Sequence, residues 1–425
     1  MSRTSTSKLK ATAVMASALM ISLAGCASGA TPQADPENQK LIFVTYQGGE
    51  AGEKYVQVVD AFEEANPGVE VEIQVLTGDD TYNGVVTSRI QGGTSPDLFE
   101  TLNGYAGLEP YVSAEMIEDL SDQPWVSDQI AAAKEFAELF DDKTVQFSAQ
   151  VDGSGVFYNE DLFEQYDVEV PTNWDEFLDV VDIFRAAGVT PLAVGAKDGW
   201  PFLQQVGQMA AQYPELSRGG ADFDGLLSGE LPFSETAWAD IIDEYAGLIA
   251  MGAYDPNASG ITFNSSVDDF ANGRAAMFIN GTFAVSAIRG ANPDLPVASF
   301  PLPYTDDQKD LKLLVGLGAN LVIPTTAPNG ELAKKFLAFL AEPEILSAYL
   351  TTASAFSPLV GVSGEIDPAA EGLAPYVEEN SINNTASAAL APAARAALLA
   401  GMQSMIAGSA TAGDVLAQVD LAQKQ

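Results

Sequence analysis

The chain has 425 residues, a single cysteine, no histidine and a formal charge of −40 at neutral pH. The absence of histidine excludes Ser-His-Asp and Cys-His triads and histidine-ligated zinc. One cysteine allows neither an intrachain disulfide nor a thiolate metal site. A charge this negative repels nucleic acid and anionic lipid, so neither is an expected partner.

The N-terminus predicts a signal peptide over residues 1–25. Its basic start contains Arg3, Lys8 and Lys10. The apolar segment 11–23 is too short to span a bilayer as a stable anchor. It leads into Leu23-Ala24-Gly25-Cys26, which resembles the lipobox of bacterial lipoproteins and implies that Cys26 is acylated as the first mature residue. Residues 26–39 are small and polar with two prolines, which predicts a flexible tether.

The remaining chain, roughly 400 residues, exceeds the usual size of a single hydrophobic core, so two lobes are expected. It opens with a β-loop-α-β unit: an apolar strand over 40–46, a helix over 53–65 and a half-exposed strand over 69–75. In open α/β sheets, ligands bind beyond the carboxyl ends of the strands. Tyr46 and Gln47 are therefore candidate site residues.

A second strand end carries polar residues to the same edge. A helix is predicted over 82–91, and a short strand over 97–100 then delivers Thr101 and Asn103. For each of these positions taken alone, a solvated loop is the alternative to a ligand contact.

An extended run interrupted by two glycines covers residues 149–159 and predicts a hinge strand between the lobes. Asp152 would then lie in the cleft. The segments 295–303 and 354–358 are expected to be the second and third crossings. The resulting boundaries are 40–149 with 300–353 for lobe 1, and 150–299 with 354–425 for lobe 2.

The second lobe is expected to contain a helix capped by Thr172, with Asp175 at its third position, and closed by Gly188. A strand over 190–195 then leads to Trp200. The indole there is a candidate stacking platform, although a tryptophan in a lobe of this size is often partly core.

A strand over 275–279 ends at a predicted strand-to-helix corner, residues 280–283. Gly281 allows the backbone to approach a guest closely, and unpaired N–H groups at a helix start, with Thr282, favour hydroxyl or anionic ligands. Phe283 adds an aromatic ring beside these donors. The alternative is an ordinary connection with a core phenylalanine.

Three further features complete the expected chain. Asn320 lies inside an apolar strand over 316–324, where a buried amide must find a partner in backbone, water or ligand. Ser265 is expected to cap a short helix and Asn329 an amphipathic one. The alanine-rich C-terminal segment is expected to be helical.

Five motifs follow one another along the chain: the lipobox, SPDLF, GVFYNEDLFE with PTNWDEF, GRAAMFINGTF, and GLGANLVIPTTAPNGELAKKFLAFLAEPE. Together they resemble the extracellular solute-binding proteins, family 1, of bacterial carbohydrate ABC importers. The resemblance implies a two-lobed, periplasmic-binding-protein-like α/β fold that exchanges strands across a hinge. It also implies a monomer without cofactor or catalysis, lipid-anchored on the extracellular face of the membrane, that delivers a sugar, an oligosaccharide, to ABC permease subunits.

Proteins that bind neutral sugars combine aromatic rings, which stack on C–H faces, with carboxylate and amide hydrogen-bonding groups. The resemblance points to these ligand-binding residues: Tyr46, Gln47, Thr101, Asn103, Asp152, Trp200, Gly281, Thr282, Phe283 and Asn320. Relatives usually have tryptophan at the position of Phe283, so stacking there would use less area.

Two other functions remain open from the sequence. A secreted glycosidase would need two carboxylates about 5 to 9.5 Å apart around one bond, and no motif singles out such a pair. A binder of a different solute is the other alternative. A polyamine would fit an acidic cleft with aromatic residues, a phosphate ester is a further option, and the lack of histidine weighs against an iron chelate.

Overall fold

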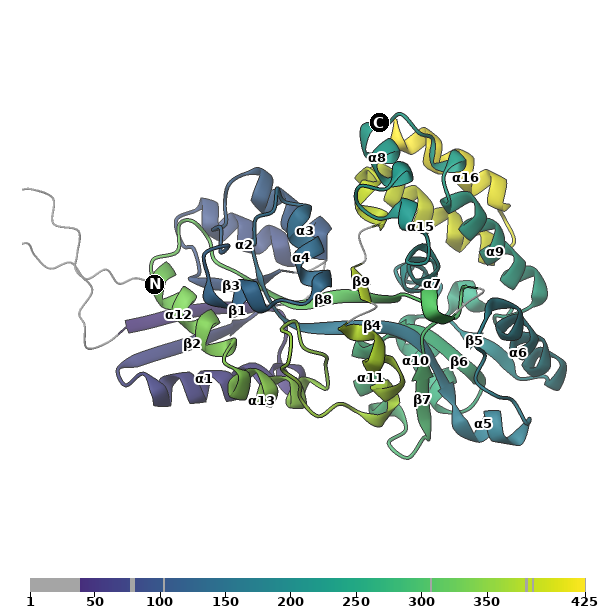
Figure 1. The fold of residues 1–425 in the computed structure, drawn as a ribbon, viewed down its shortest axis with the longest axis horizontal. Coiled ribbons are helices and arrows are strands. Elements are labelled where there is room, and N and C mark those ends of the chain that lie inside the picture. Colours follow the sequence, from purple (N-terminus) through teal and green to yellow (C-terminus); the bar gives the residue numbers. More distant parts are fainter. Residues whose placement is uncertain are drawn as a thin grey trace, which may run out of the picture.

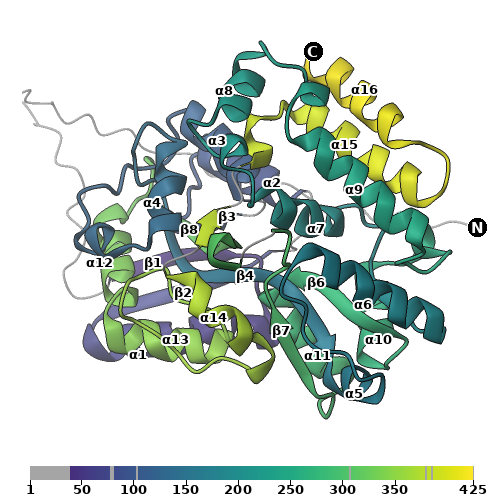
Figure 2. The ribbon, with the colours of Figure 1, turned by 45° about the vertical axis from the view of Figure 1, so that its right-hand side comes forward.

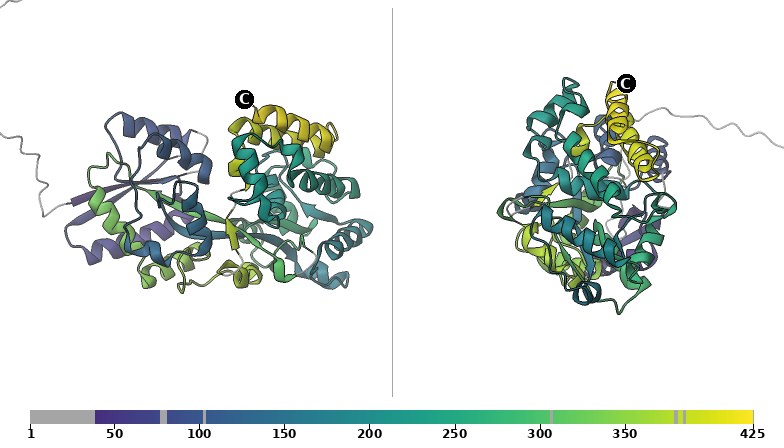
Figure 3. Two further views of the ribbon diagram at one scale, coloured as in Figure 1. Left: turned by 45° about the horizontal axis from the view of Figure 1, so that its top comes forward. Right: turned by 90° about the vertical axis from the view of Figure 1, so that its right-hand side faces the viewer.

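The computed structural model describes residues 39–76, 81–101, 104–305, 308–378, 381–383 and 386–424, so the predicted signal peptide, Cys26 and Asn103 lie outside the described residues. The described chain forms two α/β lobes that lie side by side and are joined by long strands (Figures 1 and 3). The predicted fold class and two-lobed architecture are confirmed. Within these ranges, no helix has both the length and the apolar character that crossing a membrane requires.

The strands form one continuous path in the order β2-β1-β3-β8-β4-β6-β5, with β7 paired to β4 and β9 paired to β8. Their bounds are β1 (Gln39–Thr45), β2 (Val69–Val75), β3 (Leu98–Thr101), β4 (Phe147–Asn159), β5 (Thr190–Ala193), β6 (Ala275–Gly281), β7 (Val297–Phe300), β8 (Leu313–Val322) and β9 (Ser381–Asn383). In lobe 1, β1 is parallel to β2 and β3, as a β-loop-α-β unit requires.

Helices cover both faces of the lobe 1 sheet (Figure 1). One face packs against α1 (Glu53–Ala65), α12 (Gly330–Leu340) and α13 (Pro343–Ala353), and the other against α2 (Tyr82–Gln91), α3 (Gly104–Ser113) and α4 (Ala131–Glu138). The helix predicted over 53–65 is confirmed, and its apolar face packs inward, because Tyr55, Val58, Val59 and Phe62 are all buried at helical spacing.

Lobe 2 is built around β5, β6 and the second half of β4 (Figure 2). One core is enclosed by α5 (Glu160–Gln165), α6 (Trp174–Ala187), α7 (Pro201–Ala210), α8 (Ala221–Ser228), α9 (Trp238–Met251), α15 (Pro392–Ile406) and α16 (Ala412–Gln423). A smaller core lies against α10 (Phe263–Ala271) and α11 (Val285–Ala291). The C-terminal segment, which also contains α14 (Ala374–Val377) and β9, is largely helical as expected.

Strand β4 belongs to both lobes. Residues 147–153 pair with β8, whereas residues 154–159 pair with β6 and β7. Gly155 lies just beyond this change of partners, paired with Asn280, and a Cβ there would lie 2.6 Å from Leu373 Cδ2 and 2.9 Å from the carbonyl oxygen of Phe300. A larger residue would therefore push β4 away from its neighbours at the junction.

The predicted crossings need one correction. Residues 295–303 contain β7, which pairs with the lobe 2 half of β4, and the strand that accompanies β4 between the lobes is β8. The predicted third crossing, residues 354–358, contacts the same place, since Phe356 and Val151 exchange two backbone hydrogen bonds of 2.8 and 3.1 Å. The exact lobe boundaries stay a prediction.

Two predicted helix caps are wrong by a few residues. The N-cap of α6 is Asn173, whose side chain accepts a hydrogen bond from Glu176 N, while Thr172 donates to the Glu176 carboxylate. The N-cap of α10 is Thr262, whose hydroxyl accepts from Ser265 N. Asn329 does precede α12, but its side chain donates to Lys40 O and Asp97 instead of capping. Gly188 closes α6 in the left-handed conformation as predicted.

Candidate functional site

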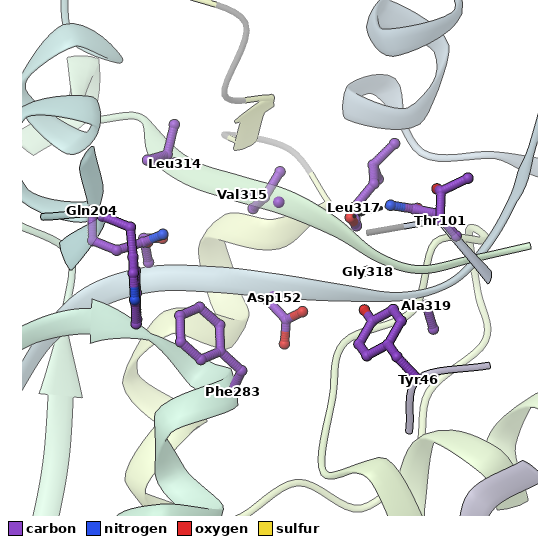
Figure 4. Close-up of a pocket in the computed structure, with 14 residues that line it drawn as sticks. Tyr46, Thr101, Asp152, Gln204, Phe283, Leu314, Val315, Leu317, Gly318 and Ala319 are labelled. Atoms are coloured by element: carbon purple, nitrogen blue, oxygen red, sulfur yellow. Dashed lines mark hydrogen bonds between the residues drawn. The ribbon is translucent and has the colours of Figure 1, made fainter. Parts of the chain in front are cut away.

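A cavity of about 430 Å³ lies between the lobes, over β4 and β8 (Figure 4). Six residues that the sequence pointed to line it: Tyr46, Thr101, Asp152, Trp200, Phe283 and Asn320. Segments far apart in the chain meet here because the carboxyl ends of β1 and β3 face the corner that follows β6. The role of these residues as ligand contacts stays a prediction.

Three other predicted residues lie next to the cavity without lining it. The Gln47 side chain turns into lobe 1 and donates to the carboxylate of Glu100. Thr282 is buried and donates to Asp152 Oδ1 over 3.3 Å. Gly281 lies beneath Phe283. Asn103 lies outside the described residues.

The lobe 1 wall presents Tyr46 and Thr101. The Tyr46 ring meets the Tyr82 ring edge to face, with 5.4 Å between centroids, and Tyr82 in turn donates to Glu100 O over 2.8 Å. The Thr101 hydroxyl is buried and has no hydrogen-bond partner among the described residues. An unpaired buried hydroxyl is costly. The Thr101 hydroxyl therefore has hydrogen-bonding capacity left for a ligand or a water molecule.

The lobe 2 wall presents an aromatic pair. The centroids of Trp200 and Phe283 lie 5.9 Å apart, and Phe263 supports Trp200 at 5.0 Å. Phe283 is 42% exposed, so the alternative of a core phenylalanine is wrong. A Cβ on Gly281 would lie 2.3 Å from Phe283 Cε1, so glycine is what allows the ring to lie over the backbone at this corner.

The corner differs from the sequence expectation in one respect. A short 3-10 turn, η6 (Thr282–Ala284), precedes α11, and the Gly281 N–H is taken by the side chain of Asn280 at 2.9 Å. The main contributions of the corner are therefore the Phe283 ring and the buried Thr282 hydroxyl, and not the row of free N–H donors that the sequence predicted.

Asp152 lies on the floor between the two walls (Figure 4). Its carboxylate accepts from Gln150 Nε2 at 3.2 Å and from Thr282 Oγ1 at 3.3 Å. It lies against β8, since a Cβ on Gly318 would come within 2.6 Å of Asp152 Oδ2. Burial raises the pKa of Asp152, and the Gln150 hydrogen bond, the Lys54 charge and the Thr282 hydrogen bond oppose that rise.

Asn320 finds its partners inside the protein. Its Oδ1 accepts from Ser148 Oγ at 2.8 Å and its Nδ2 donates to Leu317 O at 3.0 Å. The preceding residue, Ala319, has φ of +50°, a conformation that costs a non-glycine residue about 1 kcal/mol or more. The cavity wall at β8 is therefore locally strained at Ala319.

Sequence reasoning missed two polar residues of the cavity, Ser154 and Gln204. Ser154 Oγ donates to Gln204 Oε1 at 2.8 Å, which leaves the amide N–H groups of Gln204 as donors. Both positions had a usable signal. Ser154 is two residues after Asp152 on a strand, and Gln204 is four residues after Trp200, so that each shares a face with a predicted residue.

A fully buried carboxylate lies behind the cavity. Glu100 is fully buried and accepts from the side chains of Thr45 and Gln47. Burial raises the pKa of Glu100, and the Thr45 bond, the Lys54 charge and the Gln47 bond oppose that rise. Over the part of the chain that the structure describes, no cluster of three or more metal-ligating side chains occurs.

Comparison with known proteins assigns the family. Residues 47–345, more than half of the chain, match the bacterial extracellular solute-binding proteins. The chain belongs to this family. The resemblance found in the sequence is thereby confirmed, and the members of the family are binding proteins.

Two sugar-binding proteins resemble the chain over most of their length. The multiple sugar-binding protein of Streptococcus mutans serotype c is 24% identical over 347 residues, 80% of this chain and 78% of that protein. The melibiose/raffinose/stachyose-binding protein MelE of Bacillus subtilis is 21% identical over 356 residues, 82% of this chain and 81% of that protein.

A solved structure shares the fold of this solute-binding protein. The SBP RafE in complex with raffinose has a TM-score of 0.73 at 19% identity, and the match covers 90% of this chain and 98% of that chain. At this identity the likeness establishes a common fold.

The raised pKa of Asp152 predicts a pH-dependent stability difference. Between the ordinary carboxyl pKa of 3.8 and the raised value, the folded protein binds more protons at this site, so its contribution to the unfolding free energy falls as pH rises. Asp152→Asn removes that contribution. The unfolding free energy of the variant minus that of the wild type should therefore increase with pH from about 4 upwards and then level off.

Urea unfolding at a series of pH values measures this difference. Asp60→Asn, which removes an exposed carboxylate of α1, controls for the loss of one negative charge. A difference for Asp152→Asn that is flat, or that falls with pH, would contradict a raised pKa of this carboxylate.

Proposed function

We propose that this solute-binding protein captures a neutral saccharide between its lobes and delivers it, unaltered, to the permease subunits of an ABC importer. One observation carries the proposal: aromatic rings from both lobes, Tyr46 on one side and Trp200 with Phe283 on the other, flank a single carboxylate. Rings can stack on the apolar C–H faces of a sugar, while Asp152 accepts hydrogen bonds from its hydroxyls.

The cavity also provides donors and acceptors suited to hydroxyl groups. Gln204 offers amide N–H groups, and Thr101 has an unused hydroxyl. A volume of about 430 Å³ falls in the range typical of small-molecule sites, roughly 300–1,000 Å³. The names of the two sugar-binding relatives favour an oligosaccharide, with raffinose, melibiose and stachyose as the first candidates.

The ligand contacts in this proposal are those expected from the sequence, with two additions. Tyr46, Thr101, Asp152, Trp200, Phe283 and Asn320 would form the binding surface together with Ser154 and Gln204. Three residues would support this surface from behind. Gln47 donates to Glu100 and Thr282 to Asp152, and Gly281 leaves room for the Phe283 ring.

Binding would close the two lobes by bending β4, β8 and the segment near Phe356, since these connect them. We take lobe 1 as residues 40–149 with 300–353 and lobe 2 as 150–299 with 354–425. A sugar that contacts both walls favours the closed population in proportion to its differential affinity for that state.

The alternatives fit the cavity less well. Among the described residues, Asp152 is the only acid that lines it, whereas glycoside hydrolysis needs two carboxylates around one bond. A polyamine would require several acidic contacts for its several cations, and the described lining offers one. We therefore propose a binding function without catalysis and without a cofactor.

Isothermal calorimetry of the mature protein with raffinose, melibiose, stachyose and spermidine tests the proposal. We expect saturable binding of at least one saccharide, no binding of spermidine, and no cleavage products after prolonged incubation. Tight spermidine binding, or release of free monosaccharide, would replace the proposal with one of the alternatives.

Trp200→Ala should weaken binding of that saccharide by about 1 to 3 kcal/mol, because one apolar stacking surface is lost. Trp174→Ala is the matched control, since Trp174 lies in lobe 2 outside the cavity lining, where it stacks on Phe177. An unchanged affinity in folded Trp200→Ala would remove Trp200 from the site.

The N-terminal sequence is the basis for the proposed cellular location. We propose a monomer that is anchored on the extracellular face of the membrane through a lipid on Cys26, with residues 26–39 as its tether. Cys26→Ser in the full-length precursor should move the protein from the membrane fraction to the soluble fraction of expressing bacteria. Membrane association that persists after high-salt washing would contradict the lipid anchor.

A further inference from the structure

A buried lysine lies behind the cavity without lining it. Lys54, in α1, is 8% exposed, and its ammonium donates to Gln150 Oε1 at 2.8 Å. It also lies 5.7 Å from the ring centroid of Tyr55 and 5.5 Å from that of Tyr349. The salt bridges formed by described residues do not include it. Burying a cation costs stability unless its surroundings compensate, so this position needs a reason.

The hydrogen bonds of Gln150 suggest that reason. Gln150 Oε1 accepts two bonds, from Lys54 and from the Tyr349 hydroxyl at 3.2 Å. An ammonium can only donate hydrogen bonds, so the Gln150 amide must direct its oxygen towards Lys54 and its Nε2 the other way. That Nε2 donates to Asp152 at 3.2 Å.

These hydrogen bonds form a series that connects lobe 1 to the floor of the cavity and then to lobe 2. It runs from Lys54 through Gln150 to Asp152, which also accepts from Thr282 on the lobe 2 corner. Both partners of Asp152 are donors, so the carboxylate is held as an acceptor with capacity left for the cavity. We propose that Lys54 is a positioning residue that, through Gln150, holds Asp152 ionised and directed at the ligand. This inference rests on the proposed function.

The charges around this series support its direction. Glu100 from β3 and Asp152 from β4 both favour the charged form of Lys54, against the effect of burial, which lowers the pKa of Lys54. The Lys54 charge in turn favours the ionised forms of Asp152 and Glu100. The other titratable groups facing it, Tyr55 and Tyr349, have pKa values raised by burial and remain neutral.

Lys54→Met tests the proposal with raffinose as probe. Affinity at neutral pH should fall on the order of tenfold, the worth of a hydrogen bond to a charged group. The loss of binding on acidification should also begin at a higher pH than in the wild type, because a nearby cation no longer favours the carboxylate. Lys40→Met, which removes an exposed lysine of lobe 1, is the matched control and should change neither quantity.

Gln150→Met separates the charge from the hydrogen bond. It keeps the ammonium but removes the donor to Asp152, so affinity should fall and the acid limb of the pH profile should still move to higher pH, because the Gln150 hydrogen bond opposes the raised pKa of Asp152 as the Lys54 charge does. A pH profile of Lys54→Met that superimposes on that of the wild type would overturn the proposal, even if affinity fell.

A second measurement needs no ligand. The Tm loss caused by Lys54→Met should be larger in the wild type than in an Asp152→Asn background, since both keep Glu100 but only the wild type keeps the Asp152 carboxylate that the lysine favours. Equal losses in both backgrounds would overturn the coupling of Lys54 to Asp152. If the coupling is found but no saccharide binds, the proposed function fails and the coupling does not.

Discussion

The pairing of one strand with partners in both lobes is the constraint on which the rest of this structure depends. Because β4 pairs with β8 along residues 147–153 and with β6 and β7 along residues 154–159, neither lobe can complete its sheet without the other. Asp152 lies at the end of the first set and Ser154 at the start of the second. The floor of the cavity is therefore fixed by backbone hydrogen bonds, whereas the walls above it belong to separate hydrophobic cores.

This arrangement explains how a strongly acidic protein can offer a site for an uncharged ligand. The many carboxylates of the chain are mostly on the surface, where water and salt screen them. Inside, Asp152 and Glu100 are each surrounded by donors, and Lys54 is placed where its charge acts on both. Lys54 thus offsets part of the negative charge behind the cavity, and the ligand meets rings, amides and hydroxyls beside a single carboxylate.

Much of this was predictable from sequence for a physical reason. Parallel strands followed by glycine or polar residues bring their carboxyl ends to one edge, which was enough to place Tyr46 and Thr101 at one cavity, whereas Asp152 followed from the predicted hinge strand over 149–159. Trp200 and Phe283 followed from the same rule applied to lobe 2. The helix bounds of α1 and α2 were also predicted, because their apolar spacing is regular and glycine or proline follows them.

The errors and omissions also have physical causes. At α6, Thr172 and Asn173 are adjacent cap formers, and the sequence pattern does not decide which adopts the extended conformation. Gln47 turned inward because Glu100, buried through tertiary packing, needed a donor. The contact of Lys54 with Gln150 joins residues 96 positions apart, and no local pattern predicts such a contact. Asn103 and Cys26 stay predictions, since they lie outside the described residues.

Small-angle X-ray scattering during a saccharide titration tests most directly whether the two lobes close on a neutral sugar. The radius of gyration of the mature protein should decrease with the saturation curve that calorimetry gives for the same sugar, and should not change with a sugar that does not bind. A radius of gyration that stays constant while calorimetry shows the site filled would contradict the account.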